Sequence, residues 1–94
     1  MILLSPAALD DMERLRSFLD AVSPDTTTRA LRLIWKAIDR LSELPSLGKP
    51  TEEDGIRQIV IRFGSSGYIL RYVIVAETGD ILITRLWHGR EERT

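Results

Sequence analysis

The sequence of 94 residues contains no cysteine and only one histidine, His88. Without cysteine, neither a disulfide framework nor a thiolate metal site can form. A zinc site with a single histidine would need several carboxylates at ligand spacing, and the sequence has no such spacing. We therefore expect neither a metal nor a cofactor. The lack of cysteine also suits a reducing compartment, so we expect a cytoplasmic protein.

Long apolar runs are missing as well. The apolar run at the start covers only residues 1–4 and has no basic segment before it, unlike a signal peptide. No stretch approaches the roughly 20 apolar residues that a transmembrane helix requires. We therefore expect no membrane association.

The net charge of −1 argues against strong direct binding to nucleic acid. Residues 1–55 contain seven Lys or Arg and ten Asp or Glu, whereas residues 56–94 contain six Arg and four Asp or Glu. The second part is mildly basic. This bias is far below the dense basic surface of a dedicated DNA-binding protein.

The sequence has no recognisable catalytic motif. Ser65 and Ser66 lack a G-x-S-x-G context, and residues 64–67 are typical of a turn rather than a phosphate-binding loop. His88 has the chemistry of a general base near neutral pH, but a lone histidine at a strand end is more often structural. We assign no catalytic residue and expect a protein that binds rather than an enzyme.

Two Ser-Pro pairs predict the starts of two helices, because serine caps a helix and proline suits its first position. They are Ser5-Pro6 and Ser23-Pro24. The apolar face expected of the first helix comprises Leu9, Met12, Leu15, Leu19 and Val22. That of the second comprises Leu31, Ile34, Trp35, Ile38, Leu41 and Leu44. Pro45 ends the second helix, and the short link between the two makes them antiparallel neighbours.

The other apolar segments alternate with a period of two, which predicts strands at Ile2–Leu4, Ile56–Phe63, Tyr68–Val75 and Ile81–Trp87. Residues 45–55 are expected to form a turn-rich loop with an acidic tip. Residues 77–80 form a hairpin turn in which Gly79 is free to take a positive φ. We predict a single α+β domain over residues 1–94, of order β-α-α-β-β-β. The helical hairpin packs on one face of a small, mainly antiparallel sheet.

Charged residues on the strands are candidates for partner binding. Alternation places Arg71 with Ile69 and Val73, and Arg85 with Ile83 and Trp87, on the face that the helices leave uncovered. There, Arg57 or Arg62 would extend them into a row. The alternative is a solvated face with arginine stems lying over apolar neighbours. The full candidate set is Arg57, Arg62, Arg71, Arg85, His88, Arg90 and Trp35. Trp35 is expected to seal helix against sheet, or alternatively to be a partly exposed anchor.

Several segments, in their order and spacing, resemble the ParE/RelE superfamily of toxins from bacterial type II toxin–antitoxin systems. They are the short first strand, the end of the helical hairpin at residues 37–45, the Gly48-Lys-Pro50 loop, residues 67–72, and residues 81–90 with their closing His-Gly-Arg. The resemblance covers nearly the whole chain and implies the RelE/ParE-like fold.

The resemblance implies one of two mechanisms. RelE-like members are ribonucleases that cut messenger RNA on the ribosome. They use lysines on the second strand, an arginine just after Gly-Tyr, an arginine after the last strand and often a late tyrosine. Here residues 58–61 contain no lysine, Ile69 follows Gly67-Tyr68, and no tyrosine follows the last strand. Only Arg90 is a counterpart.

The sequence therefore fits better with the ParE-like branch, whose studied members inhibit DNA gyrase by protein–protein contact. The implied partner is a cognate antitoxin with a DNA-binding head and an extended tail. Acidic residues of this tail would lie opposite Arg57, Arg71 and Arg85. Two alternatives stay open. One is a degenerate RelE-like ribonuclease that uses Arg90, His88 and Arg62. The other is a non-toxic relic that binds only its antitoxin.

Overall fold

The computed structural model describes residues 1–91. Its elements in chain order are β1 (Ile2–Leu4), α1 (Pro6–Val22), α2 (Pro24–Glu43), the 3-10 turn η1 (Pro45–Leu47), β2 (Lys49–Pro50), β3 (Arg57–Phe63), β4 (Ser66–Ile74) and β5 (Ile81–His88). The last three residues of the predicted domain, 92–94, lie outside the described part. No helix within residues 1–91 is long and apolar enough to cross a membrane.

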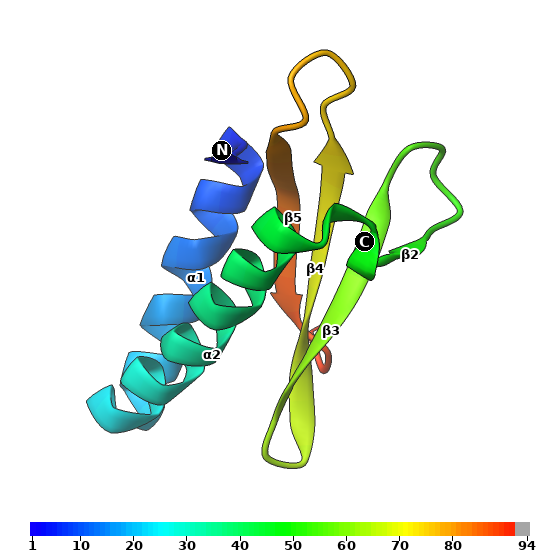
Figure 1. Ribbon diagram of the computed structural model, residues 1–94. Coiled ribbons are helices and arrows are strands. Elements are labelled where there is room, and N and C mark those ends of the chain that lie inside the picture. Colours follow the sequence, from blue (N-terminus) through cyan, green and yellow to red (C-terminus); the bar gives the residue numbers. More distant parts are fainter. Residues whose placement is uncertain (92–94) are drawn as a thin grey trace.

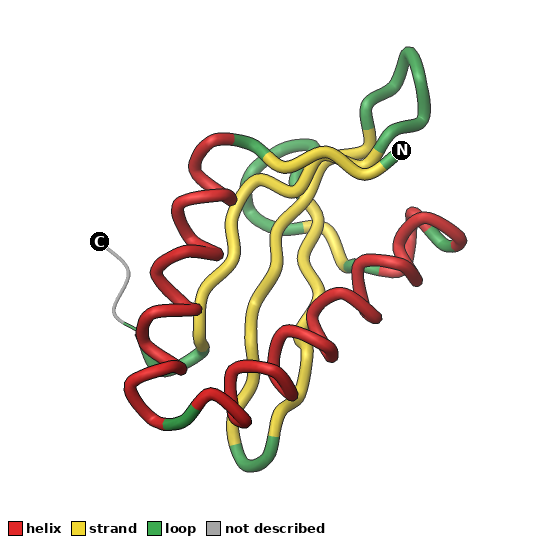
Figure 2. The backbone as a smooth tube through the Cα atoms, turned by 90° about the vertical axis from the view of Figure 1, so that its left-hand side faces the viewer, coloured by secondary structure: helices red, strands yellow, loops and turns green. Residues whose placement is uncertain are grey.

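The strands form one sheet in the order β1-β5-β4-β3-β2, and both helices lie on the same side of it (Figures 1 and 2). β1 pairs with β5 in parallel, and the three other pairings are antiparallel. The α+β architecture with a helical hairpin on a mainly antiparallel sheet is confirmed. The parallel pairing brings the start of the chain beside its last strand.

The two predicted helix starts are present and explain where the chain turns. The hydroxyl of Ser5 accepts a hydrogen bond from the N–H of Ala8, and the hydroxyl of Ser23 accepts one from Thr26, both at 3.1 Å. Each satisfies one of the free N–H groups of a helix start. Ser23 lies between the helices and caps both, since its own N–H donates to the carbonyl of Leu19.

The buried face of α1 differs from the predicted one. Leu9 and Val22 are 54% and 65% exposed, whereas Ala8 and the charged Asp11 are buried. The face nearest the sheet is centred on Leu15, and Ala8 and Asp11 lie within about 40° of it at 100° per residue. The small Ala8 lets the helix approach the strands closely.

Trp35 is 44% exposed, so the expected core role is wrong and the alternative of an exposed residue holds. The core face of α2 is formed by Thr27, Ala30, Ile34, Ile38 and Leu41. Trp35 lies about 100° from Ile34 around the helix and points to its flank. Leu44, which was also expected to be buried, is 53% exposed at the end of the helix.

Lys49 and Pro50, expected in a loop, form the two-residue strand β2, which pairs with Gln58 and Arg57. Gly48, just before it, is held on both sides. Its N–H donates to the hydroxyl of Tyr72 at 2.8 Å, and its carbonyl accepts from the guanidinium of Arg57 at 2.6 Å. The Gly48-Lys-Pro50 segment is therefore a joint that ties the end of α2 to the sheet.

A β-bulge between β4 and β5 changes the predicted faces. Arg71 is opposite Arg85, but the next residue of β4, Tyr72, is opposite Ile83, so Thr84 is the extra residue. The hydroxyl of Thr84 donates to the carbonyl of Arg71 at 3.1 Å. Because of the bulge, Ile83 is buried in the core, and the prediction that it shares a face with Arg85 is wrong.

Candidate functional site

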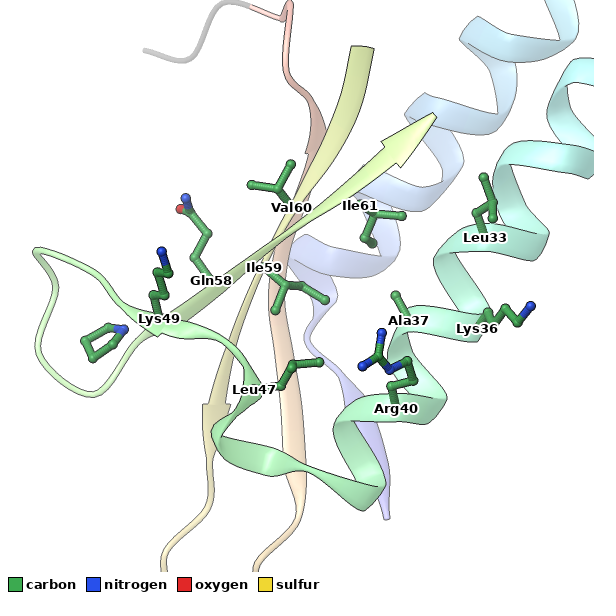
Figure 3. Close-up of a pocket in the computed structure, with 11 residues that line it drawn as sticks. Leu33, Lys36, Ala37, Arg40, Leu47, Lys49, Gln58, Ile59, Val60 and Ile61 are labelled. Atoms are coloured by element: carbon green, nitrogen blue, oxygen red, sulfur yellow. The ribbon is translucent and has the colours of Figure 1, made fainter. Parts of the chain in front are cut away.

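A groove with a volume of about 700 Å³ lies between α2 and β3 (Figure 3). Its walls are apolar side chains of the helix flank, of the η1 turn and of the strand. The lining residues are Leu33, Lys36, Ala37, Arg40, Leu47, Lys49, Pro50, Gln58, Ile59, Val60 and Ile61. The exposed apolar residues at its mouth include Val60, 60% exposed, and Leu47, 40% exposed.

An open strand edge borders the groove. β2 pairs only with residues 57 and 58 of β3, and it is the last strand of the sheet on that side. Residues 59–63 of β3 therefore pair with β4 on one side and, within the described part of the chain, with no strand on the other side. Unpaired backbone groups along such an edge are a template for another strand.

The groove carries positive charge. Lys36 and Arg40 come from α2 and Lys49 from β2, and among residues 1–91 no acidic residue lines the groove. In Figure 3, Arg40 projects toward the apolar floor formed by Leu47 and Ile59, whereas Lys36 points outward from α2 and Lys49 stands beside Gln58 on the other side of β3. Such a site is complementary to an extended or helical segment that has both apolar and acidic side chains.

The predicted arginine row on the uncovered face is only partly present. The register places Gln58, Arg71 and Arg85 in line across β3, β4 and β5. Arg57 points to the helix side, where it binds Gly48, so its predicted place in the row is wrong. Arg62 lies on the uncovered face but opposite Gly67, four residues along β3 from Gln58.

Arg71 is bound by acidic residues of its own chain. Its guanidinium donates to Glu53 and Glu52 at 3.1 Å each, and its Nε–H donates to Gln58 at 3.0 Å. It also lies over the ring of Trp87, 5.6 Å from the ring centroid. Arg71 as a whole is only 8% exposed.

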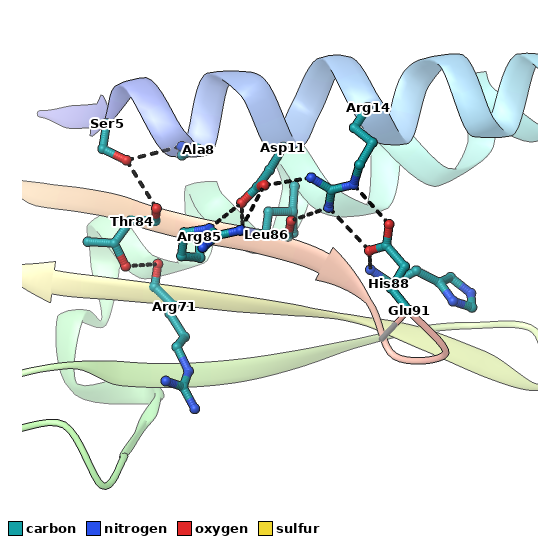
Figure 4. Close-up of polar contacts among 10 residues, drawn as sticks. All are labelled: Ser5, Ala8, Asp11, Arg14, Arg71, Thr84, Arg85, Leu86, His88 and Glu91. Carbon is teal, nitrogen blue, oxygen red and sulfur yellow. Dashed lines mark hydrogen bonds and ion pairs between the residues drawn. The ribbon is translucent and has the colours of Figure 1, made fainter. Parts of the chain in front are cut away.

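Arg85 is bound by Asp11, which reaches the sheet from α1 (Figure 4). The Asp11 carboxylate accepts hydrogen bonds from Arg85 at 2.8 Å, from Arg14 at 2.7 Å and from the N–H of Leu86 at 2.8 Å. Arg14 in turn donates to the carbonyl of Leu86 at 3.3 Å. β1 pairs with β5 only as far as Ile83, so these two side chains satisfy backbone groups of β5 beyond the end of β1.

The electrostatics of this cluster favour the charged forms. Burial raises the pKa of Asp11, but the hydrogen bonds from Arg85, Arg14 and Leu86 outweigh it and lower the pKa below its usual value. Glu91 behaves in the same way. Burial raises its pKa, but hydrogen bonds from Arg14 and from the N–H of His88 outweigh burial and leave the pKa below its usual value. The cluster is therefore an internal ion network that ties α1 to β5.

Both ring nitrogens of His88 have hydrogen-bond partners within the chain. The N–H of Arg90 donates to Nδ1 at 3.1 Å, and Nε2 lies 3.1 Å from the hydroxyl of Ser66. The ring packs edge-on against Tyr68 on the helix side of the sheet. Burial, together with the charge of Glu91, raises the pKa of Tyr68, so this phenol stays neutral.

The candidate residues are thus dispersed. Three of them are exposed: Arg62 on β3, Arg90 after β5 and Trp35 on α2. His88 instead faces the helices, where its ring lies near Phe18. The groove residues Lys36, Arg40 and Lys49 were missed by the sequence reasoning. A signal exists for two of them: Leu33, Lys36 and Arg40 follow each other at spacings of three and four on one flank of α2. Within residues 1–91, no three His, Asp or Glu side chains converge to hold a metal ion.

Known proteins show clear similarity to this chain. Residues 2–93 match the family model described as the ParE toxin of the type II toxin–antitoxin system parDE. Toxin RelE1 of Caulobacter vibrioides is 37% identical over 95 residues, which cover 98% of this chain and 96% of that protein. Toxin RelE3 of the same species is 30% identical over 90 residues, which cover 96% of this chain and 95% of that protein.

Solved structures share the fold. The chromosomal ParDE system from P. aeruginosa matches with a TM-score of 0.71 at 16% identity, over 93% of this chain and 92% of that chain. The intact E. coli RelBE toxin–antitoxin complex matches with a TM-score of 0.66 at 19% identity, over 99% of this chain and 98% of that chain. Together with the family match, these similarities show that the chain belongs to the ParE toxin family of the ParE/RelE superfamily, the toxins of type II toxin–antitoxin systems.

Proposed function

We propose that this toxin acts in the bacterial cytoplasm by binding a protein target, with DNA gyrase as the expected target. We further propose that a cognate antitoxin neutralises it by placing an acidic, partly apolar segment in the groove between α2 and β3. The observation that carries the second proposal is the combination of an apolar floor, the helix cations Lys36 and Arg40 and an open strand edge along one groove.

The charge of the groove selects its occupant. A second copy of this chain pairing edge to edge would bring two sets of Lys36, Arg40 and Lys49 together, and like charges at short range oppose association. An antitoxin segment with Asp or Glu opposite these cations and apolar residues over Leu47 and Ile59 has no such penalty. Pairing of its backbone with residues 59–63 would add a sixth strand to the sheet.

The engagement of the cations supports binding rather than cutting. Phosphoryl transfer from RNA needs cations around the phosphate and groups that move protons. Arg71 and Arg85 are held by carboxylates of the chain itself, and both ring nitrogens of His88 have partners within the chain. His88 and Arg62 also lie on opposite sides of the sheet. The assignment of gyrase rests on the resemblance to the ParE-like branch.

The RelE-like endonuclease remains the second candidate, because the two Caulobacter relatives carry the name RelE. Induction of the chain without its antitoxin separates the possibilities. We expect growth arrest with an SOS response and no codon-specific cleavage of messages in primer extension. Cleavage without an SOS response would replace the proposal by the nuclease. Normal growth at a verified protein level would replace it by a non-toxic antitoxin-binding relic.

Reversing charge in the groove tests the antitoxin site. The double variant Lys36→Glu/Arg40→Glu is expected to bind the product of the adjacent small open reading frame about tenfold more weakly, measured by calorimetry after co-purification. Wild-type affinity should also fall with added salt. The matched control is Arg16→Glu/Arg32→Glu, which makes the same charge change on exposed helix positions outside the groove. Equal weakening in both variants would contradict docking in the groove.

A further inference from the structure

The open edge of β3 presents backbone groups at every second residue. Thr51 donates its N–H to the carbonyl of Ile56 at 2.9 Å, so this carbonyl points to the side of the strand on which β2 lies. The N–H and C=O groups of an antiparallel strand alternate in direction with a period of two. Those of Val60 and Arg62 therefore point to the open side, whereas those of the residue between them point to β4. In the described part of the chain, no strand pairs with the open side at Val60 and Arg62.

A strand added at this edge would contact both faces of the sheet. Ile61 is buried under the helices, whereas Val60 points to the outer face, as Figure 3 shows, and Arg62 is exposed on that same face. Val60 also lines the groove, so the groove and the outer face meet at this edge.

The side chains of the added strand would alternate in the same way, because residues directly opposite each other in a sheet point to the same face. The positions opposite Val60 and Arg62 would point to the outer face. The position opposite Ile61 would point into the groove, where Leu33 and Ala37 form the wall on α2.

Arg62 is an exposed cation whose guanidinium has no carboxylate partner among residues 1–91. Arg71 and Arg85, the other arginines of the outer face, are both bound by carboxylates of the chain. The residue opposite Arg62 on β4 is Gly67, which has no side chain to contact the guanidinium. The nearest side chain on the other flank of Arg62 would therefore come from a strand added at the open edge.

We propose that the antitoxin segment enters the groove as a β-strand paired with Val60 and Arg62, and that Arg62 selects it by binding a carboxylate on the outer face. The recognised pattern covers four consecutive positions. An acidic residue opposite Ile59 points to the helix side, toward Arg40. Apolar residues lie opposite Val60 and Ile61, and a second acidic residue lies opposite Arg62. The inference rests on the proposed function for the identity of the segment as antitoxin, while the pairing and the pattern follow from β3 and α2.

The backbone of β3 favours a strand over a helix as the occupant. A helix satisfies most of its N–H and C=O groups internally, so it would exclude water from Val60 and Arg62 without pairing with their backbone groups. A strand pairs with them and keeps the twist of the sheet. A second copy of this chain is disfavoured, because its own β3 would bring another Arg62 to the same edge. β2 covers residues 57 and 58, and the turn at Gly64 follows β3, so the added strand is short.

The test uses a synthetic probe, so it does not depend on the antitoxin. The toxin is titrated with the blocked peptide Thr-Glu-Val-Val-Glu-Thr, which has the same sequence in both chain directions and so fits parallel and antiparallel pairing. Amide hydrogen exchange is measured by nuclear magnetic resonance. At a peptide concentration ten times the dissociation constant, we expect exchange at Val60 and Arg62 to slow about tenfold. Exchange at Ile61 should stay unchanged, because its N–H is already paired with β4.

Two comparisons test the pattern. The glutamine peptide Thr-Gln-Val-Val-Gln-Thr is expected to bind about tenfold more weakly than the glutamate peptide. The variant Arg62→Gln should weaken the glutamate peptide about fivefold and the glutamine peptide hardly at all, whereas Arg16→Gln, the same change at an exposed position of α1, should bind both peptides like the wild type.

Three results would overturn the strand site: fast exchange at Val60 and Arg62 with saturating peptide, slowing at Ile61 equal to theirs, or equal affinity for the two peptides. The antitoxin is then tested separately. Arg62→Gln should also weaken binding of the co-purified product of the adjacent small open reading frame. If only Lys36→Glu/Arg40→Glu weakens that complex, the groove site holds and the strand site is wrong. If that product does not bind the wild-type toxin, the proposed function fails, while the peptide titration still decides the strand site.

Discussion

Replacing Asp11 with asparagine is expected to lower the free energy of unfolding by about 2–4 kcal/mol, which would be among the largest effects of any single substitution in this chain. The carboxylate is 3% exposed and accepts hydrogen bonds from two arginines and one backbone N–H. Asparagine keeps the shape but removes the charge and turns an NH₂ group toward these donors. The figure lies below that for a fully buried pair because Arg14 and Arg85 are each 44% exposed.

Urea unfolding followed by circular dichroism measures the effect, and Asp10→Asn is the matched control. Asp10 is the exposed neighbour of Asp11 on α1, so its neutralisation should change stability by less than about 0.5 kcal/mol. If both variants lost the same stability, the network between α1 and β5 would not be the cause.

The dependence on pH provides a second check of the same prediction. The pKa of Asp11 is lowered in the folded protein, so its charge stabilises the fold fully above the unfolded value of about 3.8. That contribution is lost as the pH falls through the lower, folded value. The gap in stability between wild type and Asp11→Asn should therefore be constant near neutral pH and shrink below about pH 4. A gap that persists unchanged in acid would contradict an electrostatic origin.

Replacing Gly48 with alanine is expected to cost about 2–3 kcal/mol, although the change adds only one methyl group. A Cβ at this position would lie 2.7 Å from both the Cε1 and the hydroxyl of Tyr72, and 3.0 Å from the carbonyl of Gln58. Relief of the clash requires the joint to move away from the sheet. The hydrogen bonds of the Tyr72 hydroxyl with Gly48 and with the carbonyl of Pro45 would then lengthen or break.

The same displacement would shift Leu47 and Lys49, which flank Gly48 and line the groove. Gly48→Ala should therefore show both a lower midpoint in urea and weaker binding to the antitoxin, whereas Ser46→Ala, at an exposed position in the same turn, should change neither. Tyr72→Phe should reproduce about half of the stability loss, since it removes the hydrogen bonds without the clash. Wild-type stability in Gly48→Ala would show that the joint is not tightly packed.

The sequence predicted the elements well where local chemistry determines them. Ser5 and Ser23 cap their helices, and Gly79 takes a φ of 76° in the hairpin turn. Features that depend on two segments at once were not predictable. The bulge at Thr84 shifts the register of β5 by one residue, and nothing in the sequence of that strand distinguishes it from regular alternation. Faces assigned by counting residues therefore failed at Ile83.

The candidate site was predictable only in part, for a similar reason. The arginines of the strands are visible as cations flanked by apolar residues, but their partners lie far away in the chain. Arg85 is neutralised by Asp11 and Arg71 by Glu52 and Glu53. The groove depends on how far α2 stands from β3, a distance that no periodicity encodes. Spacing shows which residues share a helix flank, but not whether that flank is covered.

The parallel pairing of β1 with β5 has a consequence for how the toxin is made. Ile2 is opposite Ile81, so β1 pairs with a strand that is synthesised almost 80 residues later. α1 packs against both α2 and β5, so part of its apolar face stays uncovered until residues 81–88 emerge. Contacts between such distant residues form slowly and late in folding. The sheet therefore cannot be completed before β5 has been synthesised, and β1 has no strand partner until then.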